Sequence, residues 1–200
     1  MSDTNVKLWL VRHGETEWSA TGRHTGRTDV PLNDAGRRRA EALGRRLAKR
    51  PFTAVLTSPL TRAVETCRLA GYGDVATCTD DLMEWDYGSY EGRTTMDIRA
   101  EVPGWTLWNG GVPKGETVDQ VAQRTRRVIE AAAVVGGDVA LFAHGHVLRV
   151  LTACWLELGP ASGARFGLGT ATLSVLGYEH ETRVVTRWNQ DSHLVYLEGA

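Results

Sequence analysis

Two histidines in the sequence come directly after short apolar runs. His13 follows residues 8–11 and Arg12, and His144 follows residues 139–143; a glycine comes after each histidine. Short apolar runs that end abruptly are typical of buried strands. An imidazole at such a strand end can act as a nucleophile, a base or a metal ligand, and the neighbouring guanidinium of Arg12 indicates an anionic ligand.

A second guanidinium is predicted close to the end of another strand. Residues 54–57 form a short apolar run, and Ser58-Pro59 follows it directly. Serine followed by proline is a helix-start signal, with the serine as N-cap and the proline in the first turn. Arg62 is therefore predicted in the first helical turn, where unpaired N–H groups also favour an anion.

These strand ends are predicted to meet in one site. Strands that alternate with helices form a largely parallel sheet, whose carboxyl ends share one edge. Two imidazoles and two guanidiniums beside glycine-containing turns would bind a compact polyanion, and phosphate fits best because a guanidinium can bind two of its oxygens. The four side chains are those of Arg12, His13, Arg62 and His144.

Such a site suggests a two-step phosphoryl transfer. A neutral His13 can attack phosphorus in line and form a phosphohistidine that water then cleaves. Arg12, Arg62 and His144 would stabilise charge on the equatorial oxygens. The leaving alkoxide needs a proton, and Glu84, in an acidic and aromatic loop over residues 81–92, is the candidate donor.

The chain length of 200 residues fits one α/β domain over residues 1–200. Residues 93–115 are predicted to form one or two short helices that act as a lid and specificity insertion. Residues 15–30 are predicted to be a loop over the end of the first strand. The remaining predictions are a helix over 34–49 capped by Asn33, a helix after Thr117 that ends at Gly136-Gly137, a helix after His144, and strands over 171–178 and 182–188.

Composition limits the partners and the compartment. The net charge of -1 gives no overall attraction to nucleic acid or to an anionic membrane. No apolar run approaches the roughly 20 residues of a membrane span, and residues 1–6 lack a signal-peptide core. Cys67, Cys78 and Cys154 are expected to be core residues in a reducing compartment. We therefore expect a cytoplasmic protein without nucleic-acid or membrane partners; a homodimer stays an open alternative.

The motifs taken together resemble those of the histidine phosphatase superfamily, also called the phosphoglycerate mutase-like family. The resemblance runs from about Lys7 to His193 and rests on Leu10-Val11-Arg12-His13-Gly14-Glu15-Thr16, Ser58-Pro59-Leu60-Thr61-Arg62-Ala63, Glu84 with Tyr87-Gly88 and Glu91-Gly92, and Ala143-His144-Gly145. It implies a three-layer α/β/α sandwich with a mostly parallel central sheet, no cofactor and no metal. It also implies that His13 is the phosphorylated nucleophile, that Glu84 is the proton donor, and that Arg12, Arg62 and His144 form the phosphate pocket.

One branch of that family is especially similar. Arg23-His24-Thr25-Gly26 and the segment from Glu84 to Gly92 look like the acid phosphatases and sedoheptulose-bisphosphatase-like enzymes. Many members carry asparagine where this chain has Ser19, whose hydroxyl can still donate to phosphate. The implied activity is that of a metal-independent histidine acid phosphatase for a small phosphorylated metabolite, with a sugar phosphate or bisphosphate favoured. The further implied phosphate or substrate contacts are Ser19, Thr25, Gly26, Trp85, Tyr87 and Gly145.

Three other functions stay open at this point. A cofactor-dependent phosphoglycerate mutase shares the motifs, but the family's mutases have an arginine after the acid, where this chain has Trp85. A metallohydrolase could use His144 and His146, although zinc hydrolases usually add a third ligand. A non-catalytic binder of phosphorylated metabolites would not need the complete set of His13, Arg62, Glu84 and His144.

Overall fold

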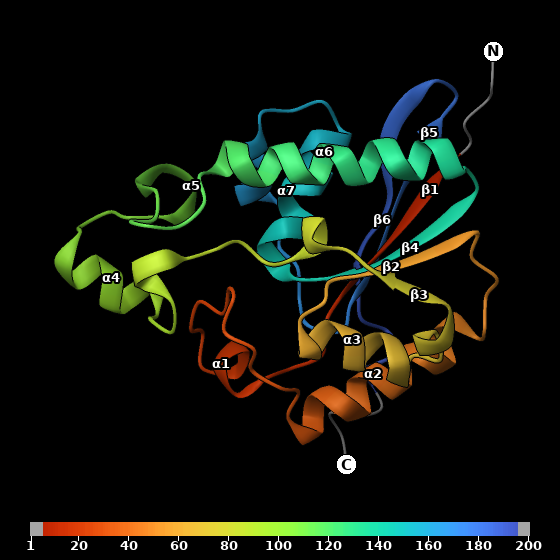
Figure 1. Ribbon diagram of the computed structural model, residues 1–200, viewed down its shortest axis with the longest axis horizontal. Helices are drawn as coiled ribbons and strands as arrows, with labels where there is room; N and C mark the ends of the chain where they lie inside the picture. The colour runs from red at the N-terminus through yellow and green to blue at the C-terminus, as the bar shows by residue number, and fades with distance from the viewer. Residues whose placement is uncertain (1–5, 196–200) are drawn as a thin grey trace.

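The computed structural model describes residues 6–195, and within this range six strands form one sheet (Figure 1). The strand order is β3-β2-β4-β1-β5-β6. The pairs β3/β2, β2/β4 and β4/β1 are parallel, whereas β1/β5 and β5/β6 are antiparallel, so the predicted mostly parallel sheet is confirmed. The strands are β1 Lys7–Arg12, β2 Ala54–Thr57, β3 Ala76–Cys78, β4 Asp138–Ala143, β5 Leu173–Glu179 and β6 Thr182–Gln190.

Helices cover both faces of this sheet. Figure 1 shows α6 and α7 on one side of the strands and α2 and α3 on the other. The helices are α1 Glu17–Ala20, α2 Asp34–Leu47, α3 Thr61–Leu69, α4 Thr95–Glu101, α5 Leu107–Gly110, α6 Val118–Val135 and α7 Gly145–Trp155. Short 3-10 turns lie at Gly73–Val75 (η1), Asp80–Leu82 (η2), Gly88–Tyr90 (η3) and Pro160–Arg165 (η4).

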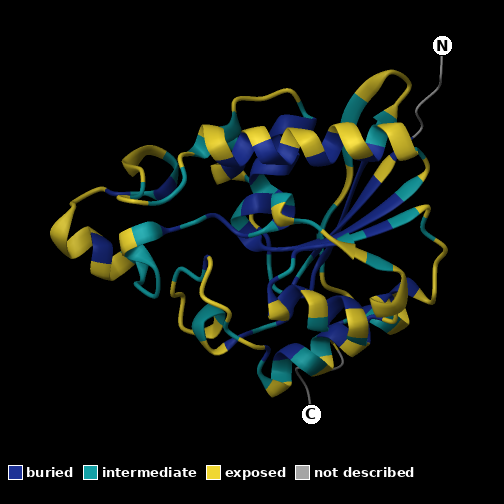
Figure 2. Cartoon of the chain, in the orientation of Figure 1, coloured by how far each residue is buried: buried dark blue, intermediate teal, exposed yellow. Residues whose placement is uncertain are grey.

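The central strand β1 divides the core into two clusters. Successive strand side chains point to opposite faces, so Leu8 and Leu10 join the cluster under α6 and α7, while Trp9 and Val11 join the cluster over α2 and α3. Figure 2 shows that the strands are mostly buried and that exposed residues lie on the outer faces of the helices. The three-layer α/β/α sandwich is therefore confirmed.

Two predicted helix starts are confirmed by their caps. The side chain of Asn33 accepts a hydrogen bond from the Gly36 N–H at 2.8 Å at the start of α2. Thr117 and Gln120 form a reciprocal capping box at the start of α6, where a helix is predicted after Thr117. At both positions, residues within one turn of the cap were sufficient to predict where the helix begins.

The prediction that Ser58 is the N-cap of α3 is wrong. The helix begins at Thr61 with Leu60 in the cap position and no side-chain cap bond, so Pro59 precedes the helix. Ser58 is instead fully buried, and its hydroxyl lies 2.7 Å from Nε2 of His144. Ser58 therefore contacts His144, a residue distant in the chain, and does not cap the N-terminus of α3. Arg62 still lies in the first turn, as predicted.

Two smaller predictions also need correction. Residues 15–30 are not all loop, because α1 forms there with a reciprocal capping box between Thr16 and Ser19. A four-residue helix offers no apolar periodicity that a sequence pattern could reveal. Cys78 is exposed at the end of β3, at the edge of the sheet, whereas Cys67 and Cys154 are buried.

The segment 93–115 contains two short helices, as predicted. In Figure 1, α4 and α5 project beyond the end of the sheet. Trp105 is 3% exposed and packs edge-on against Tyr90 at 5.3 Å between ring centroids. Its indole N–H donates to the carbonyl oxygen of Gly111 at 2.9 Å. Trp105 thus belongs to the core cluster that also contains Leu8 and Leu10.

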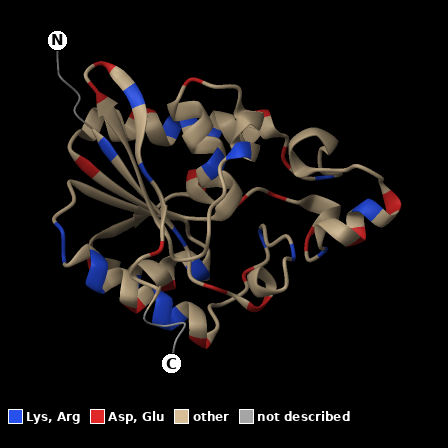
Figure 3. Cartoon of the chain, turned by 180° about the vertical axis from the view of Figure 1, so that it is seen from behind, with Lys and Arg blue, Asp and Glu red and all other residues tan. Residues whose placement is uncertain are grey.

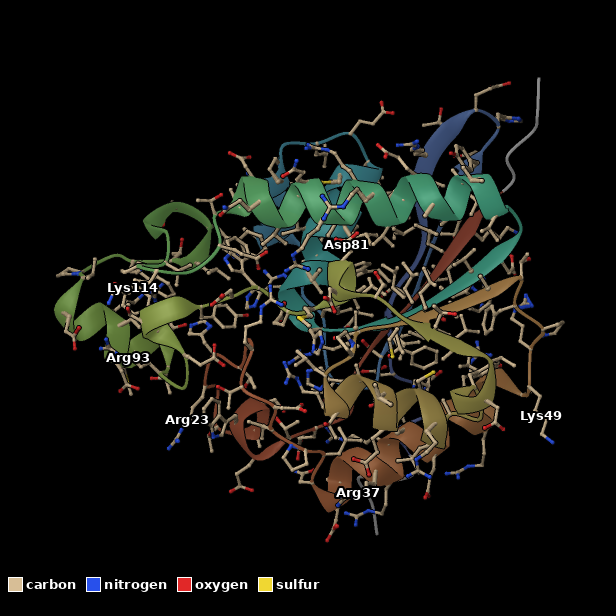
Figure 4. All side chains as sticks on the ribbon, in the orientation of Figure 1. Arg23, Arg37, Lys49, Asp81, Arg93 and Lys114 are labelled. Carbon is tan, nitrogen blue, oxygen red and sulfur yellow. The ribbon has the colours of Figure 1, made fainter. Side chains whose placement is uncertain are left out.

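Charges of both signs are interspersed along the chain (Figure 3). Arg37 and Lys49, labelled in Figure 4, lie at the periphery of the molecule. Arg37 pairs with Glu65 of α3 at 2.9 Å and with Asp34 of α2 at 3.0 Å. No helix among residues 6–195 is long and apolar enough to cross a membrane.

Candidate active site

The pairing of β1 with β4 brings the two strand-end histidines together. Arg12 lies opposite Ala143 in the register, and the His13 N–H donates to the Ala143 carbonyl oxygen at 2.9 Å. The imidazole centroids of His13 and His144 are 5.1 Å apart. The two histidine side chains therefore lie together at one edge of the sheet, as the sequence predicts.

One hydrogen bond defines the tautomer of His13. Its Nδ1 lies 2.6 Å from the carbonyl oxygen of Gly14. Because a carbonyl oxygen can only accept, Nδ1 must donate, and the neutral ring then carries a lone pair on Nε2. Burial, and after it the charges of Arg62 and Arg12, lower the pKa of His13 well below its ordinary value. The ring is therefore neutral, and Nε2 is its basic atom.

The backbone after His13 is held tightly. The Gly14 N–H donates to Oγ1 of Thr66 at 2.9 Å, and that hydroxyl donates to the carbonyl oxygen of Arg62 at 2.7 Å. A Cβ on Gly14 would lie 2.5 Å from the carbonyl oxygen of Gly36 in α2. Glycine at this position thus allows the strand end to lie against α2 while α3 binds its N–H.

Arg62 is fully buried and points at His144. Its Nε donates to Nδ1 of His144 at 3.1 Å, so the proton of the neutral His144 ring is on Nε2, beside the hydroxyl of Ser58. Burial, followed by the charge of Arg62, lowers the pKa of His144 well below its ordinary value. The terminal nitrogens of Arg62 donate to the carbonyl oxygens of Thr25, Gly26 and Thr28 at 3.1, 2.8 and 3.0 Å.

Arg12 presents a donor that the described residues do not use. One terminal nitrogen donates to the carbonyl oxygen of Leu168, but Nε is buried without a hydrogen-bond partner among residues 6–195. Burial lowers the pKa of Arg12, and the nearby Glu84 carboxylate opposes this shift. Orphaned buried donors are costly unless a ligand satisfies them.

Glu84 accepts three backbone hydrogen bonds. Its Oε1 accepts from the N–H groups of Trp85 and Val147, and its Oε2 accepts from the N–H of His146, each at 2.9 Å. Two of these donors belong to the first turn of α7, so the Glu84 side chain caps that helix. These bonds place a carboxyl group at the helix end that follows His144.

A second buried arginine holds the loop that carries Glu84. Arg124, on α6, donates to the carbonyl oxygens of Asp81, Met83 and Glu84. Its guanidinium is also paired with Glu116 at 2.9 Å. The loop therefore has a defined shape although its sequence has no regular period.

The side chains surround a cavity of about 270 Å³. It is lined by Arg12, His13, Ser19, Gly22, Arg23, His24, Thr25, Glu84, Tyr87, Thr95, Gly145, His146, Arg149 and Leu168. Gly26, Arg62, Trp85 and His144 are outside this lining, although the sequence places them in the site. Arg62, Trp85 and His144 are fully buried, and the Trp85 indole donates to the carbonyl oxygen of Glu116 at 2.8 Å.

The two histidines of the His144-x-His146 motif belong to different hydrogen-bond networks. His144 contacts Arg62 and Ser58, whereas Nδ1 of His146 lies 2.6 Å from the hydroxyl of Tyr87. Burial raises the pKa of Tyr87 well above its ordinary value, so the phenol is protonated and can donate or accept in this bond, according to the tautomer of His146. Both imidazoles thus have protein partners at Nδ1.

Sequence reasoning missed several residues of the site. Thr66 and Arg124 bind backbone groups around the cavity. Their sequence neighbourhoods look like ordinary helix or loop, so no local signal identifies them. His146 was noticed only as a possible ligand, and its place in the cavity lining follows from the start of α7.

Comparison with known proteins agrees with this geometry. A family model of the histidine phosphatase superfamily (branch 1) matches residues 8–191. An acid phosphatase from Mycobacterium tuberculosis is 43% identical, with 92% of each chain covered. A sedoheptulose 1,7-bisphosphatase from Saccharomyces cerevisiae is 36% identical, covering 80% of this chain and 70% of that protein.

Two further similarities complete the comparison. A probable phosphoglycerate mutase from Photorhabdus laumondii is 30% identical over 92% of this chain and 90% of that protein. The solved structure of an open reading frame from Mycobacterium tuberculosis superimposes with a TM-score of 0.88 at 41% identity, covering 92% of this chain and 97% of that one. The chain belongs to the histidine phosphatase superfamily.

Proposed function

We propose that this protein hydrolyses phosphomonoesters through a phosphohistidine on His13. The observation that carries the proposal is the 2.6 Å contact between Nδ1 of His13 and the Gly14 carbonyl oxygen, which leaves the lone pair on Nε2. His13 and Arg12 both line the cavity. A neutral, fixed imidazole beside a guanidinium is suited to attack on a phosphoryl group.

The proposed reaction has two balanced steps. In the first, Nε2 of His13 bonds to phosphorus, the ester P–O bond breaks, and the carboxyl proton of Glu84 passes to the leaving oxygen. In the second, water attacks phosphorus, the P–N bond breaks, and the water proton returns to Glu84. Inorganic phosphate leaves, and both residues are restored.

We assign different tasks to the two arginines. Arg12 would donate its unpartnered Nε to a phosphate oxygen. Arg62 already donates hydrogen bonds to His144 and to three loop carbonyl oxygens, so it would act largely through its charge and through the orientation of His144. Ser19, Thr25 and Gly145 line the same cavity and would contact the phosphate or its ester oxygen.

The proposed substrate is a small sugar phosphate or bisphosphate. Away from His13, the lining is polar and cationic, with Arg23, His24, Thr95 and Arg149. Such groups suit hydroxyls and a second anion. The similarity to proteins named acid phosphatase and sedoheptulose 1,7-bisphosphatase supports this class of substrate.

We further propose that residues 93–115 are a lid that sets specificity. Thr95 of this segment lines the cavity and lies 3.2 Å from Nε2 of His24. The tryptophans of the segment pack among aromatic neighbours, with Trp108 5.6 Å from His146 between ring centroids. Substitutions at Thr95 are expected to change substrate preference more than turnover of a simple aryl phosphate.

A substrate panel tests the proposed hydrolysis. Purified protein would be incubated with sugar phosphates, sugar bisphosphates and phosphoglycerates, and released phosphate and interconverted products would be measured separately. Phosphate release from at least one class is expected, together with an acid-labile phosphoenzyme. Interconversion of phosphoglycerates without phosphate release would instead establish a mutase, the activity named for one relative.

A further inference from the structure

The carboxylate of Glu91 is bound to the loop over residues 25–28. Its Oε1 accepts from the N–H of Gly26 at 2.7 Å and from the N–H of Thr28 at 3.2 Å. A Cβ on residue 26 would lie 2.6 Å from Oε2 of Glu91 and 2.5 Å from the carbonyl oxygen of Trp85. Glycine at this position allows the carboxylate to approach the loop so closely.

The opposite polar groups of the same loop are bound by Arg62. Its terminal nitrogens donate to the carbonyl oxygens of Thr25, Gly26 and Thr28. The loop is therefore held between an anion on its N–H groups and a cation on its carbonyl oxygens. Fixing the loop with Glu91 also fixes the acceptors that orient the Arg62 guanidinium.

This arrangement avoids a direct ion pair at the phosphate pocket. The hydrogen bonds that the structure gives Arg62 go to neutral carbonyl oxygens and to the neutral ring of His144. A carboxylate bound directly to Arg62 would compete with a substrate anion for the guanidinium charge. The intervening peptide groups orient the arginine without that competition.

The backbone around Glu91 is itself well anchored. The Gly92 N–H donates to the His24 carbonyl oxygen at 2.8 Å, and the His24 N–H donates to the Arg93 carbonyl oxygen at 2.9 Å. These two bonds align the segment of Glu91 with the loop that contains Thr25. Glu91 therefore has a defined position from which to bind Gly26.

We infer that Glu91 is a positioning residue of the phosphate pocket, which holds Arg62 and, through it, His144 in place beside the bound phosphoryl group. The inference rests on the proposed function of this pocket. The positioning depends on the length of the Glu91 side chain, which lets Oε1 accept from the N–H groups of Gly26 and Thr28, and not on its negative charge. The glutamine, aspartate and alanine variants of this residue separate reach from charge.

The experiment measures binding of inorganic phosphate to each purified variant by calorimetry, with folding checked by circular dichroism and thermal denaturation. Glu91→Gln keeps an oxygen acceptor and should bind phosphate as tightly as wild type or more tightly. Glu91→Asp keeps the charge but is one methylene shorter, and Glu91→Ala lacks the acceptor. Both should weaken phosphate binding by about 10- to 100-fold, as expected when the N–H groups of Gly26 and Thr28 lose their acceptor.

A matched control and a kinetic measurement complete the test. Asp138→Ala removes a carboxylate paired with Arg50 at the other end of β4, and it should leave phosphate binding unchanged. Glu91→Asp should also lower kcat/KM for a phosphatase substrate at a nearly unchanged melting temperature. A purely structural role would lower the melting temperature of Glu91→Asp without changing its phosphate affinity.

The outcomes separate this inference from the proposed function. If wild type binds phosphate and Glu91→Asp binds it equally well, the positioning role is wrong while the phosphatase proposal stands. Equal weakening by Glu91→Gln and Glu91→Asp would also overturn the inference, because charge would then be the cause. If wild type does not bind phosphate, the proposed function fails, and the positioning role fails with it.

Discussion

The imidazole of His13 and the carbonyl oxygen of Gly14 are joined by a 2.6 Å hydrogen bond between neighbouring residues of the chain. This local contact lies directly after β1, where the Gly14 N–H is bound by Thr66. It fixes the ring and its tautomer before any ligand is present. Preorganisation of this kind reduces the cost of reaching a reactive geometry.

Replacement of His13 should abolish turnover. His13→Ala is expected to lower kcat/KM by at least about 10³-fold, because the covalent route is lost. The acid-labile phosphoenzyme seen after rapid quenching of wild type should be absent. His180→Gln, at an exposed position between β5 and β6, is the matched control and should retain both turnover and phosphoenzyme. Phosphoenzyme formation by His13→Ala would show that another residue is the nucleophile.

Replacement of Glu84 should have an effect that depends on the leaving group. Glu84→Gln keeps an oxygen that can accept from the α7 backbone but cannot donate the carboxyl proton. For alkyl phosphates, kcat/KM is expected to fall by about 10²- to 10⁴-fold, the usual contribution of general acid catalysis. For p-nitrophenyl phosphate, whose leaving group needs no proton, the loss in the first step should be much smaller. Equal losses for both substrates would contradict the proton-donor role.

Stability should fall as the pH is lowered through the histidine range. The pKa values of His13, His144 and His146 are lowered well below 6.5 by burial, and that of His24 is lowered to about 4. Below pH 6.5, the unfolded chain therefore binds more protons than the folded protein, and the free energy of unfolding decreases. The contribution of these histidines to the free energy of unfolding is complete above the pKa of the unfolded state, and it is lost as the pH falls toward the pKa of each histidine in the folded state.

Urea denaturation at pH 7.5 and at pH 5 measures this effect. The midpoint should be lower at pH 5, and the difference should become smaller in His24→Gln, which removes one of the shifted groups. An equal or higher midpoint at pH 5 would show that these imidazoles are not kept neutral by the fold.

A methyl group at Gly36 should disturb the contact between α2 and the strand end that carries His13. The Cβ would lie 2.1 Å from the carbonyl oxygen of Glu15, which cannot move without shifting the backbone after Gly14. Gly36→Ala is expected to cost about 1–3 kcal/mol of stability, as overpacking typically does. Chemical denaturation measures this cost.

The matched control is Gly159→Ala. Nothing lies within 4 Å of a Cβ at this position, so the variant should stay within about 1 kcal/mol of wild type. Equal stability of Gly36→Ala and Gly159→Ala would mean that the close approach of Gly36 to Glu15 has no energetic consequence.

The sequence by itself determined the mostly parallel sheet and the strand ends at which His13 and His144 lie. Apolar runs of strand length ended at Arg12-His13 and at His144, and caps at Asn33 and Thr117 marked two helices. These signals are local, because a strand end or a helix cap depends on a few neighbouring residues. Cytoplasmic location and dimer formation stay predictions.

Only the tertiary structure decided how the site residues are held. Ser58 looked like a helix cap because the pattern is local, but in the fold it contacts His144, 86 residues away in the chain. Arg62 looked like a direct phosphate ligand, yet most of its donors bind a loop that Glu91 fixes from the other side. Such hydrogen bonds join residues far apart in sequence, so they follow from the packing of α3, β1 and β4 rather than from any periodicity along the chain.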